Sequence, residues 1–149
     1  MCARKSSNGK TSPRGIRLPA ALEQDIQHEA DARDGSWSAM TIELLDEAIR
    51  MRRAPGVAFV DGATGRRAVI AGTALDVWEV VATWRNVEED MNRLAQSHPR
   101  LSEMQPCAAF GYYRFFPVEV DARIEREEAW TPERERQEIP CAIPAEPTR

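Results

Sequence analysis

The segment Gly15–Pro19, with the sequence GIRLP, is the feature that most constrains the fold of this chain. Its outward and inward residues alternate, which predicts a very short β-strand that Pro19 ends. A lone strand of this length is not stable by itself. We therefore expect the strand to pair with the same strand of a second copy of the chain.

Two helices are expected directly after this strand. The first covers residues 20–33 and carries an apolar residue at every fourth position. Gly35 is expected to end it in a left-handed conformation. Ser36 or Ser38 can cap a second helix that runs to about Arg53. The second helix is apolar on more than one face, so we expect other helices to cover it on several sides.

This strand–helix–helix order resembles the ribbon-helix-helix (Arc/MetJ-like) DNA-binding family. The resemblance covers residues 14–53 and implies a dimer with a paired ribbon and four intertwined helices. It rests on Gly15–Pro19, on Gly35-Ser36-Trp37-Ser38 and on apolar helix positions. The dimer core that it implies consists of Ile16, Leu18, Leu22, Ile26, Leu45, Ala48 and Ile49.

In this family a two-stranded ribbon enters the major groove of DNA. The outward position of Arg17 then matters most, because its guanidinium can make two hydrogen bonds to guanine. The start of the second helix offers backbone N–H groups to a phosphate. The DNA-contacting residues that the resemblance implies are Lys10, Pro13, Gly15, Arg17, Ser36, Trp37 and Ser38. Mere dimerisation of the chain is the alternative reading of this module.

Residues 1–13 form a basic arm that we expect to be disordered in the free protein. Residues 1–17 contain Arg and Lys but no Asp or Glu, although the whole chain has a net charge of −4. A basic arm on an acidic protein indicates either a contact with a polyanion or a solubilising tail.

The Ala54-Pro55-Gly56 hinge is expected to separate a second module, over residues 55–129. A β-hairpin is predicted over 57–60 and 67–70, because the intervening residues favour turns. Helices are predicted over about 76–84, 87–96, 102–116 and 117–129, the third opened by a Ser102–Gln105 capping box. The expected fold class is thus α+β and mainly α.

The second module is similar to the bacterial domain of unknown function four-three-three. The similarity rests on these segments: Pro55-Gly56-Val57, Val69-Ile70-Ala71-Gly72-Thr73, Val77-Trp78, His98-Pro99-Arg100-Leu101-Ser102 and Ala108-Ala109-Phe110-Gly111-Tyr112-Tyr113. It implies a winged-helix-like fold found in antitoxin-associated genes. Pro106 departs from the large apolar residue that is usual there. Arg66-Arg67 fits a DNA-touching wing and a solvated turn equally well.

Enzyme chemistry has no support in the sequence. Gly62-Ala63-Thr64-Gly65 lacks the lysine and the following helix of a phosphate-binding loop. The acidic runs have no nearby His or Cys to complete a metal site, so no catalytic residue, metal or cofactor is expected. Cys2, Cys107 and Cys141 are expected to be free thiols. No signal peptide or membrane-spanning run is recognised, so a cytoplasmic location without membrane contact is expected.

Together the two resemblances imply a homodimeric repressor of antitoxin type that binds an operator in double-stranded DNA and autoregulates its operon. A toxin protein with a PIN-like nuclease fold is the partner that they suggest. The second module and a mostly disordered acidic tail over 130–149 would hold this partner, with Arg123, Arg126 and Trp130 as contact residues. The alternative is a dimeric adaptor that binds a protein and reads no DNA.

Overall fold

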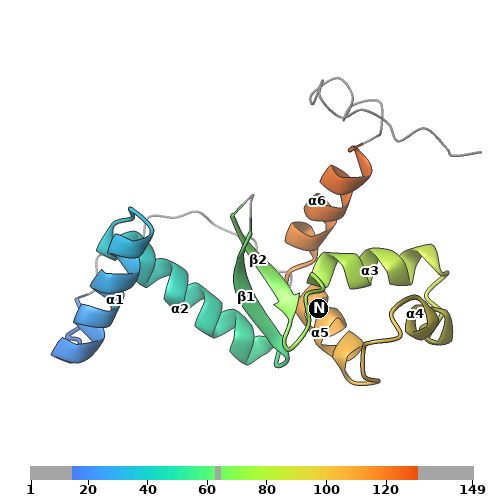
Figure 1. The fold of residues 1–149 in the computed structure, drawn as a ribbon, viewed down its shortest axis with the longest axis horizontal. Coiled ribbons are helices and arrows are strands. Elements are labelled where there is room, and N and C mark those ends of the chain that lie inside the picture. The colour runs from blue at the N-terminus through green and yellow to red at the C-terminus, as the bar shows by residue number, and fades with distance from the viewer. Residues whose placement is uncertain (1–14, 63–64, 131–149) are drawn as a thin grey trace, which may run out of the picture. The chain divides into compact units, whose positions relative to one another are not determined.

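The computed structural model describes residues 15–62 and 65–130 of the 149-residue chain. Within this part the protein is mainly helical and contains one antiparallel hairpin (Figure 1). The elements are α1 (Ala20–Ala32), α2 (Trp37–Arg53), β1 (Val57–Gly62), β2 (Gly65–Ile70), α3 (Val77–Asn86), α4 (Met91–Ser97), α5 (Gln105–Phe115) and α6 (Pro117–Glu128). This confirms the predicted α+β, mainly α class. The expected arm over 1–13 and nearly all of the expected tail over 130–149 lie outside the described residues.

The chain divides into two compact units between Leu44 and Leu45, inside helix α2. This division lies nearer the N-terminus than the 54–56 segment that the sequence indicates as a hinge. The reason is that Ala54 is only 1% exposed and belongs to the hydrophobic core of the second unit. The end of α2 therefore packs with the residues that follow it.

The first unit has a small hydrophobic core. Ile26, Ala30 and Met40 are buried, with Leu18 and Trp37 packed against them. The turn between α1 and α2 differs from the expectation, because Asp34 and not Gly35 has a positive φ, of 50°. Asp is one of the few residues other than glycine that adopt this conformation at low cost.

The second unit is built around helix α3, which packs against α4, α5, α6 and strand β2. Its largest fully buried side chains are Tyr112, Ile70, Leu94, Val77, Val80 and Val81. In the hairpin, Val57 pairs with Ile70 and Gly62 with Gly65, so each strand extends two residues further into the predicted 61–65 turn than expected. One face of the hairpin contributes to this core, through the buried Val57 and Ile70 and the partly buried Phe59 and Ala68.

Two helices of the second unit begin later than expected. Helix α4 starts at Met91 instead of about 87, because Glu88 and Glu89 have φ values of 59° and 62° and interrupt the helical path. The Asp90 side chain accepts hydrogen bonds from the backbone N–H groups of Asn92 and Arg93 and so caps the helix. A short apolar pattern does not reveal such a turn.

Helix α5 begins at Gln105 instead of Ser102. The Gln105 side chain accepts a hydrogen bond of 2.8 Å from the Ser102 backbone N–H, which is one of the two bonds of the predicted capping box. Pro106 thus lies in the first turn, where its missing N–H costs nothing, and it is buried.

The start of helix α3 is held next to strand β2. Asp76 forms a β-bridge with Val69, and its side chain caps α3 in a capping box with Glu79. The Asp76 backbone N–H donates to Glu79 Oε2 over 2.7 Å. This arrangement fixes the position of Trp78 near β2.

Candidate functional site

The predicted ribbon residues are exposed and take no regular secondary structure in the single chain. Gly15, Ile16 and Arg17 are exposed, and residues 15–19 form neither strand nor helix. The expected strand is thus not formed in the single chain. Lys10 and Pro13, which were also predicted to contact DNA, lie outside the described residues.

The predicted contacts at the start of α2 have different roles. Ser36 Oγ accepts a hydrogen bond of 3.2 Å from the Ala39 backbone N–H, so Ser36 is the residue that caps the helix. Trp37 is half-buried and packs against the core of Ile26, Ala30 and Met40. Ser38 is exposed. The indole of Trp37 therefore serves packing in this structure.

The predicted dimer core is divided between buried and exposed side chains. Ile26 is buried, and Leu18 packs against the small core of the first unit. The others are open to solvent in the single chain: Ile16 is 65% exposed, Leu45 53%, Ile49 48% and Leu22 45%, and Ala48 is also exposed. The predicted dimer core is thus mostly exposed within the described residues of one chain.

Helix α2 carries further exposed apolar residues that the predicted set did not include. Ile42 is 69% exposed, and Leu44 and Met51 are also exposed. Ile42, Leu45 and Ile49 recur at intervals of three and four residues and so follow one face of the helix. We call these three side chains the α2 apolar stripe.

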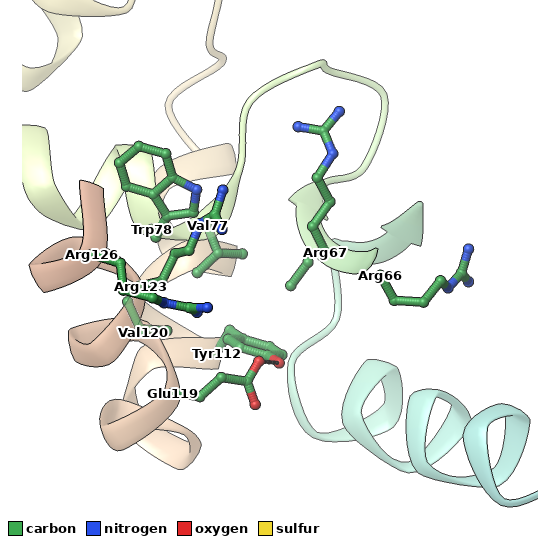
Figure 2. Close-up of a pocket in the computed structure, with 10 residues that line it drawn as sticks. Arg66, Arg67, Val77, Trp78, Tyr112, Glu119, Val120, Arg123 and Arg126 are labelled. Carbon is green, nitrogen blue, oxygen red and sulfur yellow. Dashed lines mark hydrogen bonds between the residues drawn. The ribbon is translucent and has the colours of Figure 1, made fainter. Parts of the chain in front are cut away.

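A second candidate site is a cavity of about 230 Å³ within the second unit. Strand β2 and helix α6 each contribute two arginines, and an indole from α3 and a phenol from α5 complete it (Figure 2). Its lining residues are Arg66, Arg67, Ala68, Val77, Trp78, Tyr112, Glu119, Val120, Arg123 and Arg126. We call this cavity the arginine pocket.

The two arginines of β2 are held by acidic side chains. Arg66 donates two hydrogen bonds of 2.7 Å to Glu47, which is only 8% exposed, and it points away from Trp78 and Tyr112 (Figure 2). The hydrogen bond to Glu47 raises the pKa of Arg66. Arg67 Nη1 donates over 2.7 Å to the buried Asp76. Arg66 is thus occupied by a contact within the protein, which argues against its use as a wing that touches DNA.

The two arginines of α6 lie beside the indole of Trp78 (Figure 2). The Arg123 guanidinium lies 5.7 Å from the centroid of the Trp78 ring and pairs with Glu127 over 2.8 Å. Arg126 Nε donates to the backbone carbonyl of Ala122 over 3.2 Å.

A polar network joins the buried Tyr112 to the exposed Glu119 in the pocket lining. The Tyr112 hydroxyl donates to Glu119 over 2.8 Å and accepts from Arg50 over 2.7 Å, and Arg50 also pairs directly with Glu119. Burial and the bond to Glu119 raise the pKa of Tyr112 above its ordinary value. Burial lowers the pKa of Arg50, but its bonds to Glu119 and Tyr112 outweigh this effect and raise it. The carboxylate in the pocket wall is therefore neutralised by Arg50.

Of the predicted partner-binding residues, the structure brings Arg123 and Arg126 together in this pocket. Trp130 is 43% exposed and is not among the lining residues. No local pattern indicated that Arg67 and Trp78 would join them, because these residues come from different elements. The spacing of three between the two α6 arginines was the available signal, since it places both on one helix face.

Within residues 15–62 and 65–130, no group of three His, Cys, Asp or Glu residues is arranged to hold a metal ion. None of the helices in this part of the chain combines the length and the apolar character needed to cross a membrane. Comparison with known proteins finds no matching protein family, no matching curated protein and no matching solved structure.

Proposed function

We propose that this protein is a homodimeric, DNA-binding transcriptional repressor of antitoxin type. In this proposal residues 14–53 form a ribbon-helix-helix module that binds the operator of its own operon. Residues 55–129 form a winged-helix-like module that holds a partner, for which a PIN-like nuclease toxin is our candidate. The observation that carries the proposal is the α2 apolar stripe, exposed on a helix that follows a short segment with exposed Ile16 and Arg17.

A second copy of the chain is the best occupant for this apolar surface. The core of the first unit contains few buried side chains, while larger apolar side chains on the same elements remain in water. Small modules often gain the missing burial by dimerising. The segment 15–18 also needs a strand partner, and the same segment of a second copy supplies one by symmetry.

Charge supports DNA as the ligand of such a dimer. Residues 1–17 contain Arg and Lys but no Asp or Glu, and Arg17 is exposed. In a paired ribbon the two copies of Arg17 would enter one major groove and each could bind a guanine edge. The remaining bases of this segment would add salt-dependent attraction to phosphates.

The test is a band-shift assay on the DNA upstream of the gene, at two salt concentrations. We expect the wild type to shift this DNA more strongly than random DNA of the same length. Arg17→Ala should lose the sequence-specific shift, because it removes the direct contact with the bases. Arg100→Ala removes an exposed arginine from the loop before α5 and is the matched control. A wild type that shifts both DNAs equally would refute the repressor and favour a dimeric adaptor.

The partner requires a separate experiment. The protein should co-purify with the product of a neighbouring gene when the native operon is expressed, and Arg123→Gln with Arg126→Gln should weaken this complex. Purification without any small nuclease-like partner would contradict the toxin part of the proposal, whatever the outcome with DNA.

A further inference from the structure

Two arginines of the arginine pocket keep donors that no described part of the protein uses. Arg67 donates through Nη1 to Asp76, and Arg126 donates through Nε to a backbone carbonyl. Among residues 15–62 and 65–130, no hydrogen bond or ion pair occupies Nε and Nη2 of Arg67 or the two Nη atoms of Arg126. A guanidinium has five N–H donors, and a carboxylate or phosphate accepts two of them in parallel.

The same cavity has an apolar surface next to these donors. The Trp78 ring lies beside Arg123 and Arg126, and Val77 and Val120 also line the cavity (Figure 2). The Trp78 N–H is already donated to Asp76 over 2.9 Å, so the ring is held in place. Figure 2 shows Arg67 across the cavity from the arginines of α6. A ligand there meets cationic donors on two sides and an aromatic ring between them.

The size of the pocket limits the ligand. Its volume is about 230 Å³. Drug-sized ligands occupy larger cavities, of about 300–1,000 Å³. A single substituted ring therefore fits, whereas a nucleoside triphosphate is too large to be enclosed.

We propose that the arginine pocket binds a small organic anion, an aromatic carboxylate or phosphate monoester. Its anionic group lies between Arg67 and Arg126, and its ring packs against Trp78. Glu119 does not repel the anion strongly, because Arg50 neutralises it. This site is independent of the proposed dimer and of DNA.

Isothermal titration calorimetry of the full-length protein at low salt tests the proposal with four probes. Benzoate and phenyl phosphate carry both the ring and the anionic group. Benzamide carries the ring without the charge, and inorganic phosphate carries the charge without the ring. We expect benzoate or phenyl phosphate to bind more tightly than either of the other two, because only these probes use both surfaces of the pocket.

Arg126→Gln should weaken that binding at least tenfold, since it removes a charge-assisted pair of hydrogen bonds. Arg126 is exposed, and among residues 15–62 and 65–130 it bonds only to its own helix, so the variant should fold as the wild type does. Arg126→Lys should restore part of the affinity, and Arg100→Gln should leave it unchanged. Benzamide binding as tightly as benzoate, unchanged binding by Arg126→Gln, or no binding of either aromatic anion would each overturn the proposal. The DNA experiment uses none of these probes, so failure here leaves the proposed repressor unaffected.

Discussion

Shortening Leu45 to alanine tests the proposed dimer at a side chain of the α2 apolar stripe. Leu45 is 53% exposed in the single chain. Burying a whole leucine side chain stabilises by about 1.5–3 kcal/mol, so covering the exposed half contributes about 1 kcal/mol per chain. A symmetric dimer covers this residue twice, which gives a loss of about 2 kcal/mol for Leu45→Ala. The dissociation constant of the dimer should therefore rise roughly thirtyfold.

Sedimentation equilibrium over a series of protein concentrations measures this constant directly. Val118→Ala is the control, because Val118 is 81% exposed on α6 and lies outside the proposed dimer core. We expect the control to dimerise as the wild type does. The reasoning is refuted if the wild type is a monomer throughout the micromolar range, or if Leu45→Ala dimerises as tightly as the wild type.

Three further predictions concern the stability of the second unit, measured by urea denaturation. Glu47→Gln should lower the free energy of unfolding by about 2 kcal/mol, because it breaks the paired hydrogen bonds to Arg66, and an unchanged midpoint would contradict this. Gly56→Ala should cost about 2 kcal/mol, because Gly56 has a φ of 90° and a Cβ there would lie 2.9 Å from Cβ of Ala108; a variant as stable as the wild type would show that this backbone is not strained. Tyr112→Phe should cost about 1 kcal/mol near neutral pH through the lost hydrogen bonds. Folding raises the pKa of Tyr112, so the contribution of its protonated hydroxyl to stability is complete below the unfolded pKa of 10.0 and is lost as the pH rises above that value. In Tyr112→Phe the free energy of unfolding should therefore fall less steeply with pH in this alkaline range. Equal slopes for wild type and variant would contradict this assignment.

Most of the helices and the hairpin were predictable because their signals are local. The period of apolar residues placed α1 and α2 within a residue or so, and turn residues placed the hairpin. The start of α4 was wrong because Glu88 and Glu89, which have no special preference for a positive φ, adopt one. The predicted role of Gly35 was wrong for the same kind of reason, because the preceding residue, Asp34, takes the positive φ.

The candidate sites were predictable only in part, because they depend on contacts distant in the sequence. The apolar character of α2 was evident from the sequence. The exposure of each apolar residue was not, because it depends on which side chains fill the core of the folded chain. Ile26 is buried, for example, whereas Leu22 on the same helix is not. Arg67 and Arg126 join one pocket through the packing of strand β2 and helix α6 in the second unit, and neither residue carries a local mark of this.

Helix α2 runs without a break across the division between the two units, and this limits how the protein can be dissected. A fragment that ends at Arg53, after the last turn of α2, would keep Glu47 and Arg50 but remove their partners Arg66 and Glu119. An acid and a base that pair with later residues of the second unit would then lose their partners. The N-terminal segment is therefore a poor candidate for grafting onto another protein unless these two residues are redesigned with it.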